Sequence, residues 1–331
     1  MSVGRLRVVY ILGMGRSGST LLDRLLSQQE GTISLGEASN IWRNGVLEDR
    51  TCACGASFTR CDFWHDVARA SSGALSLAPA QEVVRFHDRH LDTRRMWRML
   101  TAARRREVAD AVPASYLDTV RRVYEAIAAV SGATTIVDSS KHPVYAFLLT
   151  LVPGLQVDLV HLVRDPRAVA HSWARNRIEP GTNPPTLQHR YCASQSGVLY
   201  TLYNVAAHRV AASSGGSRAF LRYEDFVERP SAILEEILGP GPDRDLNGED
   251  PDALVEVKGN HSLSGNPMRF VREKTVVQID DEWRARLPSR DRRLVETLTL
   301  PLALRYRYLP VMCRGDRARI QRTLGAHGWR C

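Results

Sequence analysis

Residues 8–22 read VVYILGMGRSGSTLL. The stretch begins with apolar and β-branched residues, passes through a Gly/Ser turn and ends in an amphipathic run. This order predicts a strand, a loop and a helix, an arrangement in which loop and helix-terminal N–H groups converge on an anion. The phosphate-binding candidates are the loop residues Gly15, Arg16, Ser17, Gly18, Ser19 and Thr20.

The spacing of this loop nearly matches that of nucleotide-binding P-loops, in which a lysine and a hydroxyl residue follow the last glycine. Here Gly18 is followed by Ser19 instead of lysine, and the cation lies inside the loop at Arg16. Because the missing lysine contacts the β- and γ-phosphates of a nucleoside triphosphate, the loop favours a donor other than ATP.

A second anion site is predicted where a buried strand ends. Residues 155–163, LQVDLVHLV, are apolar nearly throughout, and the following RDPR at 164–167 contains a proline suited to the first turn of a helix. Arg164 would lie at the carboxyl end of a strand, where doubly wound sheets bind ligands, with Ser172 two helical turns later. An arginine and a hydroxyl suit a terminal phosphate. The alternative is an ordinary helix N-terminus capped by Asp165.

Residues 15–22, GRSGSTLL, resemble the 5′-phosphosulfate-binding loop of sulfotransferases that use 3′-phosphoadenosine 5′-phosphosulfate. The arginine makes the chain more similar to bacterial carbohydrate and tyrosylprotein-type members than to the cytosolic branch, which has lysine. The eight-residue spacing of Arg164 and Ser172 is similar to the 3′-phosphate site of the family. The resemblance implies that both sites bind this donor, that adenosine 3′,5′-bisphosphate is the product, and that no metal is required.

The resemblance also implies catalytic residues. Glu37 follows the first helix, where members with the arginine loop carry a catalytic glutamate, and a carboxylate can take the proton of an acceptor hydroxyl. Lys141-His142-Pro143 is similar to the Lys-Asp-Pro of tyrosylprotein-type members, whose lysine contacts the transferring sulfuryl group. Lys141 matches that lysine, whereas His142 stands in place of the aspartate. Arg16 and Lys141 would stabilise the charge that develops on the leaving oxygen. His142 is the alternative base.

Two later segments resemble parts of the nucleotide site. Residues 223–226, YEDF, resemble a signature whose tyrosine packs near the adenine, so Tyr223 is a candidate; the alternative is a tyrosine that fills the core. Residues 258–269 resemble the late loop that folds over the nucleotide, in which Arg269 and Asn266 are the candidates.

Strands and helices alternate along the chain. We expect strands at 7–12, 134–138, 157–163 and 217–222, and helices at 19–28, 144–151, from 167, 190–212 and 230–238. This order predicts an α/β, P-loop-like, three-layer fold with a central parallel sheet flanked by helices. We expect one domain over residues 1–331, with residues 40–130 as a helical cap on the acceptor side and Gly239–Asp252 as a loop.

The 331 residues carry a net charge of +9, which suits a polyanionic donor. Nucleic acid is not expected as a partner, because basic and aromatic residues do not interleave as in RNA-binding sequences. The apolar stretch 8–12 is too short for a signal sequence or a membrane span, so we expect no integral membrane segment and a cytoplasmic location. The expected acceptor is the hydroxyl of a small molecule or carbohydrate; its identity and the oligomeric state cannot be read from the sequence.

Three cysteines gather within ten residues, at Cys52, Cys54 and Cys61. Three sulfurs are one ligand short of a closed zinc site, although His65 is a possible fourth. A C-x-C pair is less usual for zinc than C-x-x-C, and a cytoplasmic location argues against a disulfide. We predict a local staple within the cap, with zinc as the alternative, and no metal among the site residues.

Two other functions stay open at this level. A kinase with a degenerate P-loop would need an acidic metal ligand, for which Asp138 is the candidate. A non-catalytic nucleotide- or nucleic-acid-binding module would use the same loops without chemistry. A sulfotransferase should prefer adenosine 3′,5′-bisphosphate over ATP, without a need for magnesium.

Overall fold

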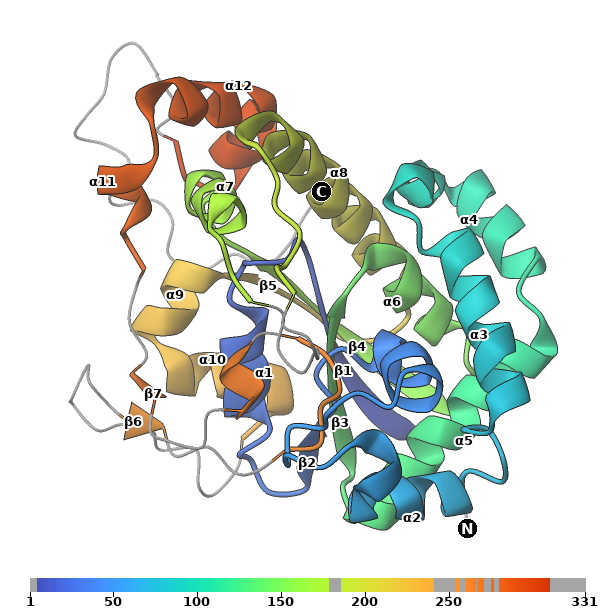
Figure 1. Cartoon of the computed structure of the whole chain (residues 1–331). Helices are drawn as coiled ribbons and strands as arrows, with labels where there is room; N and C mark the ends of the chain where they lie inside the picture. The colour runs from blue at the N-terminus through green and yellow to red at the C-terminus, as the bar shows by residue number, and fades with distance from the viewer. Residues whose placement is uncertain are drawn as a thin grey trace.

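The computed structural model describes residues 5–178, 186–240, 254–255, 260–265, 267–270, 275–276 and 280–309. Its centre is a five-stranded parallel sheet in the order β2-β3-β1-β4-β5 (Figure 1). The strands are β1 (Leu6–Leu12), β2 (Thr32–Ser34), β3 (Thr135–Lys141), β4 (Leu155–Val163) and β5 (Arg218–Arg222). The strand that precedes the Gly/Ser loop is therefore the middle one, and its carboxyl end is flanked by those of β3 and β4.

The central strand serves two cores because its side chains alternate between the faces of the sheet. Val9 and Ile11 pack with α1 (Ser19–Leu26), α9 (Tyr223–Glu228) and α10 (Pro230–Leu238). Val8, Tyr10 and Leu12 pack on the other face, with α5 (Ala114–Ser131), α6 (Pro143–Thr150) and α8 (Ala193–Ser213). Helices thus cover both faces, as a parallel sheet requires.

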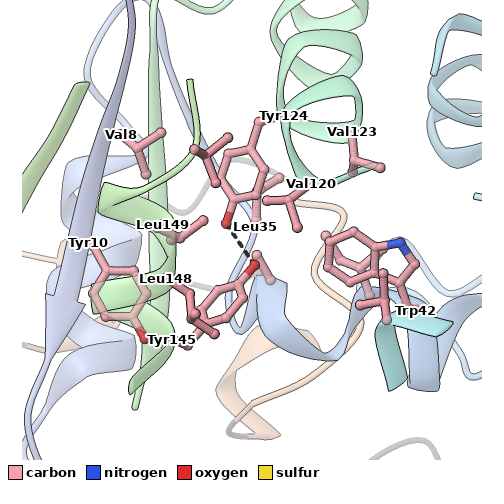
Figure 2. Packing of buried hydrophobic residues seen from close by; sticks show 14 of the residues in the cluster. Val8, Tyr10, Leu35, Trp42, Val120, Val123, Tyr124, Tyr145, Leu148 and Leu149 are labelled. Carbon is pink, nitrogen blue, oxygen red and sulfur yellow. Dashed lines mark hydrogen bonds between the residues drawn. The ribbon is translucent and has the colours of Figure 1, made fainter. Parts of the chain in front are cut away.

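The second core continues from the sheet into the helical region between β2 and β3. Figure 2 shows Tyr124 and Tyr145 packed among aliphatic side chains, with Trp42 in the same cluster. The helical segments here are η1 (Ala38–Asn40), η2 (Ile41–Leu47), η3 (Phe58–Arg60), α2 (Asp62–Ala70), α3 (Leu77–His90), η4 (Thr93–Met99) and α4 (Ala102–Asp110). Fully buried Trp42 and Trp64 come from this region, so it shares its apolar core with the sheet.

A third, smaller core lies beyond β4. It joins α7 (Pro166–Ala174) and α8 to α12 (Ser289–Arg305), which is preceded by the short α11 (Trp283–Arg286). The remaining elements are η5 (Pro267–Phe270) and an antiparallel pair of β6 (Leu254–Val255) and β7 (Thr275–Val276). Within the described ranges, no helix has the length and apolar character needed to span a bilayer.

The expected α/β fold with a parallel sheet between helices is confirmed, and so are the four expected strands and five expected helices to within a few residues. One boundary matters for the candidate site: the strand expected to end at residue 138 continues to Lys141 as β3. The three-residue β2 and helix α12 were not anticipated. Most of the expected loop 239–252 lies outside the described residues.

Candidate functional site

The Gly/Ser loop connects the carboxyl end of β1 to the first turn of α1. Gly18 precedes the helix with a φ of 90°, and a Cβ there would lie 2.2 Å from the ring of Tyr223. Both the backbone and the close tyrosine therefore demand glycine at this position. The first turn of α1, which includes Ser19 and Thr20, supplies N–H groups that lack helical partners at this edge of the sheet.

Ser17 places a buried hydroxyl in the loop. The residue is 2% exposed, and its Oγ has no hydrogen-bond partner among the described residues. A buried polar atom left without a partner costs about 1–3 kcal/mol. An oxyanion held in the loop would supply the missing partner, so the residues present fit a phosphate group.

Arg16 is held over an aromatic ring. Its guanidinium lies 4.9 Å from the ring centroid of Trp173 and donates to the side-chain oxygen of Gln188. The indole Nε1 of Trp173 in turn donates to the carbonyl of Gly15 at 3.1 Å. The tryptophan of α7 therefore fixes both the loop and its cation.

Lys141 is brought to the loop by an irregularity in the sheet. The register between β1 and β3 shifts between Tyr10 and Leu12, and Lys141 pairs with Leu12. The carbonyl of Lys141 accepts from the N–H of Gly13 at 3.1 Å. Such a bulge re-aims a side chain at the end of a strand, and here Nζ of Lys141 donates to Oε1 of Glu37 at 2.5 Å.

Glu37 sits in a ring of donors. Its other carboxylate oxygen accepts from Asn40 at 3.0 Å and from Ser264 at 3.1 Å. Burial alone raises the pKa of Glu37, but the charge and hydrogen bond of Lys141, the Ser264 bond and the charge of Arg269 outweigh it. The net pKa lies below the usual range, so the carboxylate is ionised at neutral pH and able to take a proton.

His142, the alternative base, is committed to structure. Its Nδ1 accepts from the backbone N–H of Val144 at 3.3 Å and so caps α6. A ring nitrogen that accepts an N–H carries no proton, so Nε2 carries it in the neutral ring and is a donor. Burial lowers the pKa of His142 to about 4. The neutral ring in this tautomer therefore has no free nitrogen to act as a base.

Arg164 follows β4 directly and reaches the Gly/Ser loop. Its Nη1 donates to the carbonyl of Arg16 at 3.4 Å, and its guanidinium lies 4.7 Å from the ring centroid of Tyr223. Nη2 lies 3.3 Å from a carboxylate oxygen of Asp280. Residues of the two candidate anion sites thus contact each other, and the ring of Tyr223 lies close to both Gly18 and Arg164.

Ser172 lies on α7, 5% exposed, and its Oγ accepts from Nη2 of Arg177 at 3.5 Å. The pKa of Arg177 is lowered by burial and by the positive charges of Arg175 and Arg164, so these arginines are close enough to repel one another. Three arginines thus lie near this hydroxyl, with the carboxylates of Asp280 and Glu282 beside them. Arginines beside a hydroxyl suit an anion that can compete with those carboxylates.

The second arginine of the RDPR sequence has a different role. Arg167 pairs with Asp165 at 2.7 Å and with Glu296 of α12 at 3.0 Å, and its guanidinium lies 4.5 Å from the ring centroid of Trp283. Asp165 also accepts from the N–H of Arg167 and caps α7. Asp165 therefore does cap the N-terminus of α7, which was the alternative considered from the sequence. Arg164 nevertheless contacts the Gly/Ser loop.

The late segment that carries Arg269 lies against the catalytic candidates. Arg269 is 5% exposed, and its Nη1 donates to the carbonyl of Ser262 at 3.1 Å. Ser264, two residues further, donates to Glu37. The other candidate of this loop, Asn266, lies outside the described residues.

Asp138 is the candidate for the metal ligand that a kinase would need, but its carboxylate accepts hydrogen bonds from within the fold. It is completely buried and accepts from Tyr124 at 2.6 Å and from the hydroxyl of Ser140 at 2.5 Å. Burial raises its pKa despite these bonds. The contacts leave Asp138 with a structural role between β3 and α5.

Sequence reasoning missed several residues that complete the site. Around the Gly/Ser loop and Ser172 they are Trp173, whose ring lies under Arg16, Gln188, which accepts from Arg16, and Arg177, which donates to Ser172. Around Glu37 they are its two donors, Asn40 and Ser264. Most of them lie over a hundred residues from their partners, and no local pattern marks them.

Comparison with known proteins gives one finding. A family model described as the sulfotransferase family matches residues 9–239, which include the loop, Glu37, Lys141, Arg164 and Tyr223. A search of curated proteins finds no match.

Proposed function

Because this chain belongs to the sulfotransferase family, we propose that it transfers a sulfuryl group from 3′-phosphoadenosine 5′-phosphosulfate to a hydroxyl of a small-molecule or carbohydrate acceptor. The acceptor oxygen attacks sulfur in line, the bond from sulfur to the bridging oxygen breaks, and adenosine 3′,5′-bisphosphate leaves with that electron pair. The acceptor proton passes to Glu37.

The observation that carries this proposal is the joining of two cationic sites at one sheet edge. Arg164 contacts the carbonyl of Arg16 at 3.4 Å, and the carbonyl of Lys141, the residue that pairs with Glu37, accepts from Gly13 at the start of the loop. The loop suits the 5′-phosphosulfate, while Arg164, Ser172 and Arg177 suit the 3′-phosphate. Remote anchoring of this kind orients the reacting group.

The division of chemical work follows from the charges. Arg16, Lys141 and the loop N–H groups would stabilise negative charge on the leaving oxygen. Glu37 is ionised and touches Lys141, so base and charge stabiliser would act on the same sulfuryl group. Tyr223, stacked against Arg164, offers a ring face beside the adenine of the donor.

We further propose that the helical region 40–130 forms the acceptor side. An open pocket of about 580 Å³ lies between η4 and the start of α8, lined by residues that include Thr93, Tyr191 and Leu199. Tyr191 packs on Trp173 with a centroid separation of 4.6 Å, and Trp173 supports Arg16. The pocket wall therefore leads to the phosphosulfate loop.

The donor is tested by calorimetric titration of the purified chain with adenosine 3′,5′-bisphosphate and, separately, with ATP and Mg²⁺. We expect the bisphosphate to bind without magnesium and more tightly than ATP. Arg164→Ala should weaken its binding at least tenfold, whereas the matched control Arg104→Ala, an exposed arginine of α4, should bind as the wild type does. Tighter binding of ATP, or wild-type affinity in Arg164→Ala, would refute the donor assignment.

A further inference from the structure

The three cysteines of the cap meet a histidine from the far end of the chain. The potential ligand atoms of Cys52, Cys54, Cys61 and His261 all lie within 4.8 Å of one another. Sγ of Cys61 is 3.6 Å from Sγ of Cys54, 3.8 Å from Sγ of Cys52 and 3.3 Å from Nδ1 of His261. Sγ of Cys52 is 3.7 Å from the same Nδ1.

Four of the six separations among these atoms match a tetrahedral zinc site. With Zn–S bonds of about 2.3 Å and Zn–N bonds of about 2.0–2.1 Å, tetrahedral geometry requires S···S separations of roughly 3.8 Å and S···N separations of roughly 3.6 Å. The four separations above agree with these values to within about 0.3 Å. We propose that Cys52, Cys54, Cys61 and His261 bind a zinc ion.

The backbone around the cysteines supports thiolate ligands. The chain turns back between Thr51 and Ser57, which form a bridge, and Gly55 allows the turn with a φ of 99°. The N–H groups of the residues Cys54, Ala56 and Trp64 donate to the sulfurs of Cys52, Cys54 and Cys61 respectively. Such donors orient metal-bound thiolates.

His261 replaces the fourth ligand considered from the sequence. His65 is 69% exposed in its side chain and turns to Asp66. His261 instead stacks on Phe63, with ring centroids 4.5 Å apart, and its carbonyl accepts from the indole of Trp64 at 2.8 Å. The sequence predicted a local cysteine staple within the cap, with zinc as the alternative. The proposed site is a zinc site, and it joins the cap to a segment 200 residues further along the chain.

A disulfide is a poorer account of the cluster. The separation of 3.6 Å between Sγ of Cys54 and Sγ of Cys61 is far longer than an S–S bond of about 2.05 Å. A disulfide would also use two sulfurs and leave a thiol beside the imidazole without a role. Three thiolates and one imidazole form a complete ligand set for zinc.

The proposed ion is structural, because four protein ligands leave no position for substrate. Its effect would be to hold residues 260–265 against the cap, where the N–H of Ala53 donates to the carbonyl of Ser262 at 3.0 Å. Ser264 of this segment donates to Glu37. The metal would thus fix a contact of the proposed base from a distance, but the metal site itself does not depend on the proposed function.

The test begins with the full chain purified without chelators. We expect about one zinc ion per chain when the metal content is measured by inductively coupled plasma mass spectrometry. Exchange for Co²⁺ should give the visible bands of tetrahedral cobalt and a thiolate-to-cobalt charge-transfer band. Zinc well below stoichiometry together with absent cobalt bands would refute the proposal, as would an intact mass lower by two hydrogens with Cys54 and Cys61 linked.

Four variants assign the ligands. Cys61→Ser and His261→Ala should lose zinc or bind it much more weakly, and His261→Ala should change the cobalt spectrum. The matched controls His65→Ala and Cys192→Ser should keep full zinc, because His65 faces solvent and Cys192 is an exposed thiol at the start of α8. Retention of zinc by His261→Ala with its loss in His65→Ala would overturn the assignment. If ligand variants fail to fold, the cobalt spectrum of the wild type still decides.

Discussion

Two cations of the candidate site, Arg16 and Lys141, have backbone angles that residues with side chains seldom adopt. Their φ values are 73° and 69°. Strained positions of this kind cost of the order of 1–3 kcal/mol and persist only where the surroundings determine them. Here Trp173 holds the Arg16 side chain, and the bulge against β1 fixes Lys141. Arg16 lies in the Gly/Ser loop, and the carbonyl of Lys141 accepts from Gly13 at the start of that loop. Two strained residues in contact with one loop indicate a candidate site arranged before its ligand arrives.

The structure separates the two candidate bases at the level of single residues. Glu37→Gln should lower kcat/KM by roughly 10²–10⁴-fold, because the carboxylate that takes the proton is lost. His142→Asn should change it by only a few fold, since the asparagine oxygen can still accept from Val144 and cap α6. The activity of both variants is measured as the rate at which adenosine 3′,5′-bisphosphate is released, with an acceptor found by screening.

Binding of the bisphosphate should be nearly unchanged in both variants, which controls for folding.

The lowered pKa of Glu37 means that the base stays ionised across neutral and mildly acidic pH. The wild-type rate should therefore show no loss from this group as pH falls from 8 to about 5.5. A large defect in His142→Asn with normal activity in Glu37→Gln would reverse the assignment.

The segment leading into α11 places an acidic residue on the candidate 3′-phosphate site. Asp280 lies 3.3 Å from Arg164, and although burial raises its pKa, Arg164 outweighs this and lowers it, so the carboxylate is ionised at neutral pH. Because an incoming phosphate would compete with this carboxylate, Asp280→Asn should bind adenosine 3′,5′-bisphosphate several-fold more tightly. Adenosine 5′-phosphate, which lacks the 3′ group, should bind both proteins equally in calorimetry. Equal gains for both nucleotides would contradict the placement of the 3′-phosphate.

Helix α1 carries a buried acid next to β2. Burial raises the pKa of Asp23 to about 7 from 3.8, although Ser34 donates to it at 2.5 Å. The folded state therefore holds this proton more tightly than the unfolded state, so the stabilisation is complete below about pH 4 and is lost as pH rises to 7. At 1.36 kcal/mol per pKa unit, the loss is of the order of 4 kcal/mol.

Asp23→Asn should remove this dependence. Its melting temperature should fall less than that of the wild type between pH 5 and pH 8, and at pH 8 the variant should be the more stable protein. Asp110→Asn, an exposed acid at the end of α4, is the matched control and should follow the wild type. Parallel curves for wild type and Asp23→Asn would show that this group does not titrate as expected.

Over the whole molecule, the sequence predicts what depends on neighbours along the chain. Strand β4 is a nearly continuous apolar run, and the loop around Gly18 has a characteristic spacing, so both could be predicted. Contacts set by the folded chain could not. The bulge that turns Lys141 to Glu37 depends on pairing between β1 and β3, and His261 reaches Cys61 across 200 residues. Tertiary packing decides these contacts, and no short pattern records them.

The shared core determines how the molecule should unfold. Trp42 of the helical region lies in one cluster with Val8 and Tyr10 of the central strand (Figure 2). Trp64 belongs to the same cluster. A region that buries its largest side chains with the sheet cannot unfold alone without exposing that core. Hydrogen exchange followed by mass spectrometry in increasing denaturant should therefore give one midpoint for peptides from α3 and α5 and for peptides from β1 and β4. A lower midpoint for the helical peptides would identify a separately folding cap and contradict the single-domain prediction.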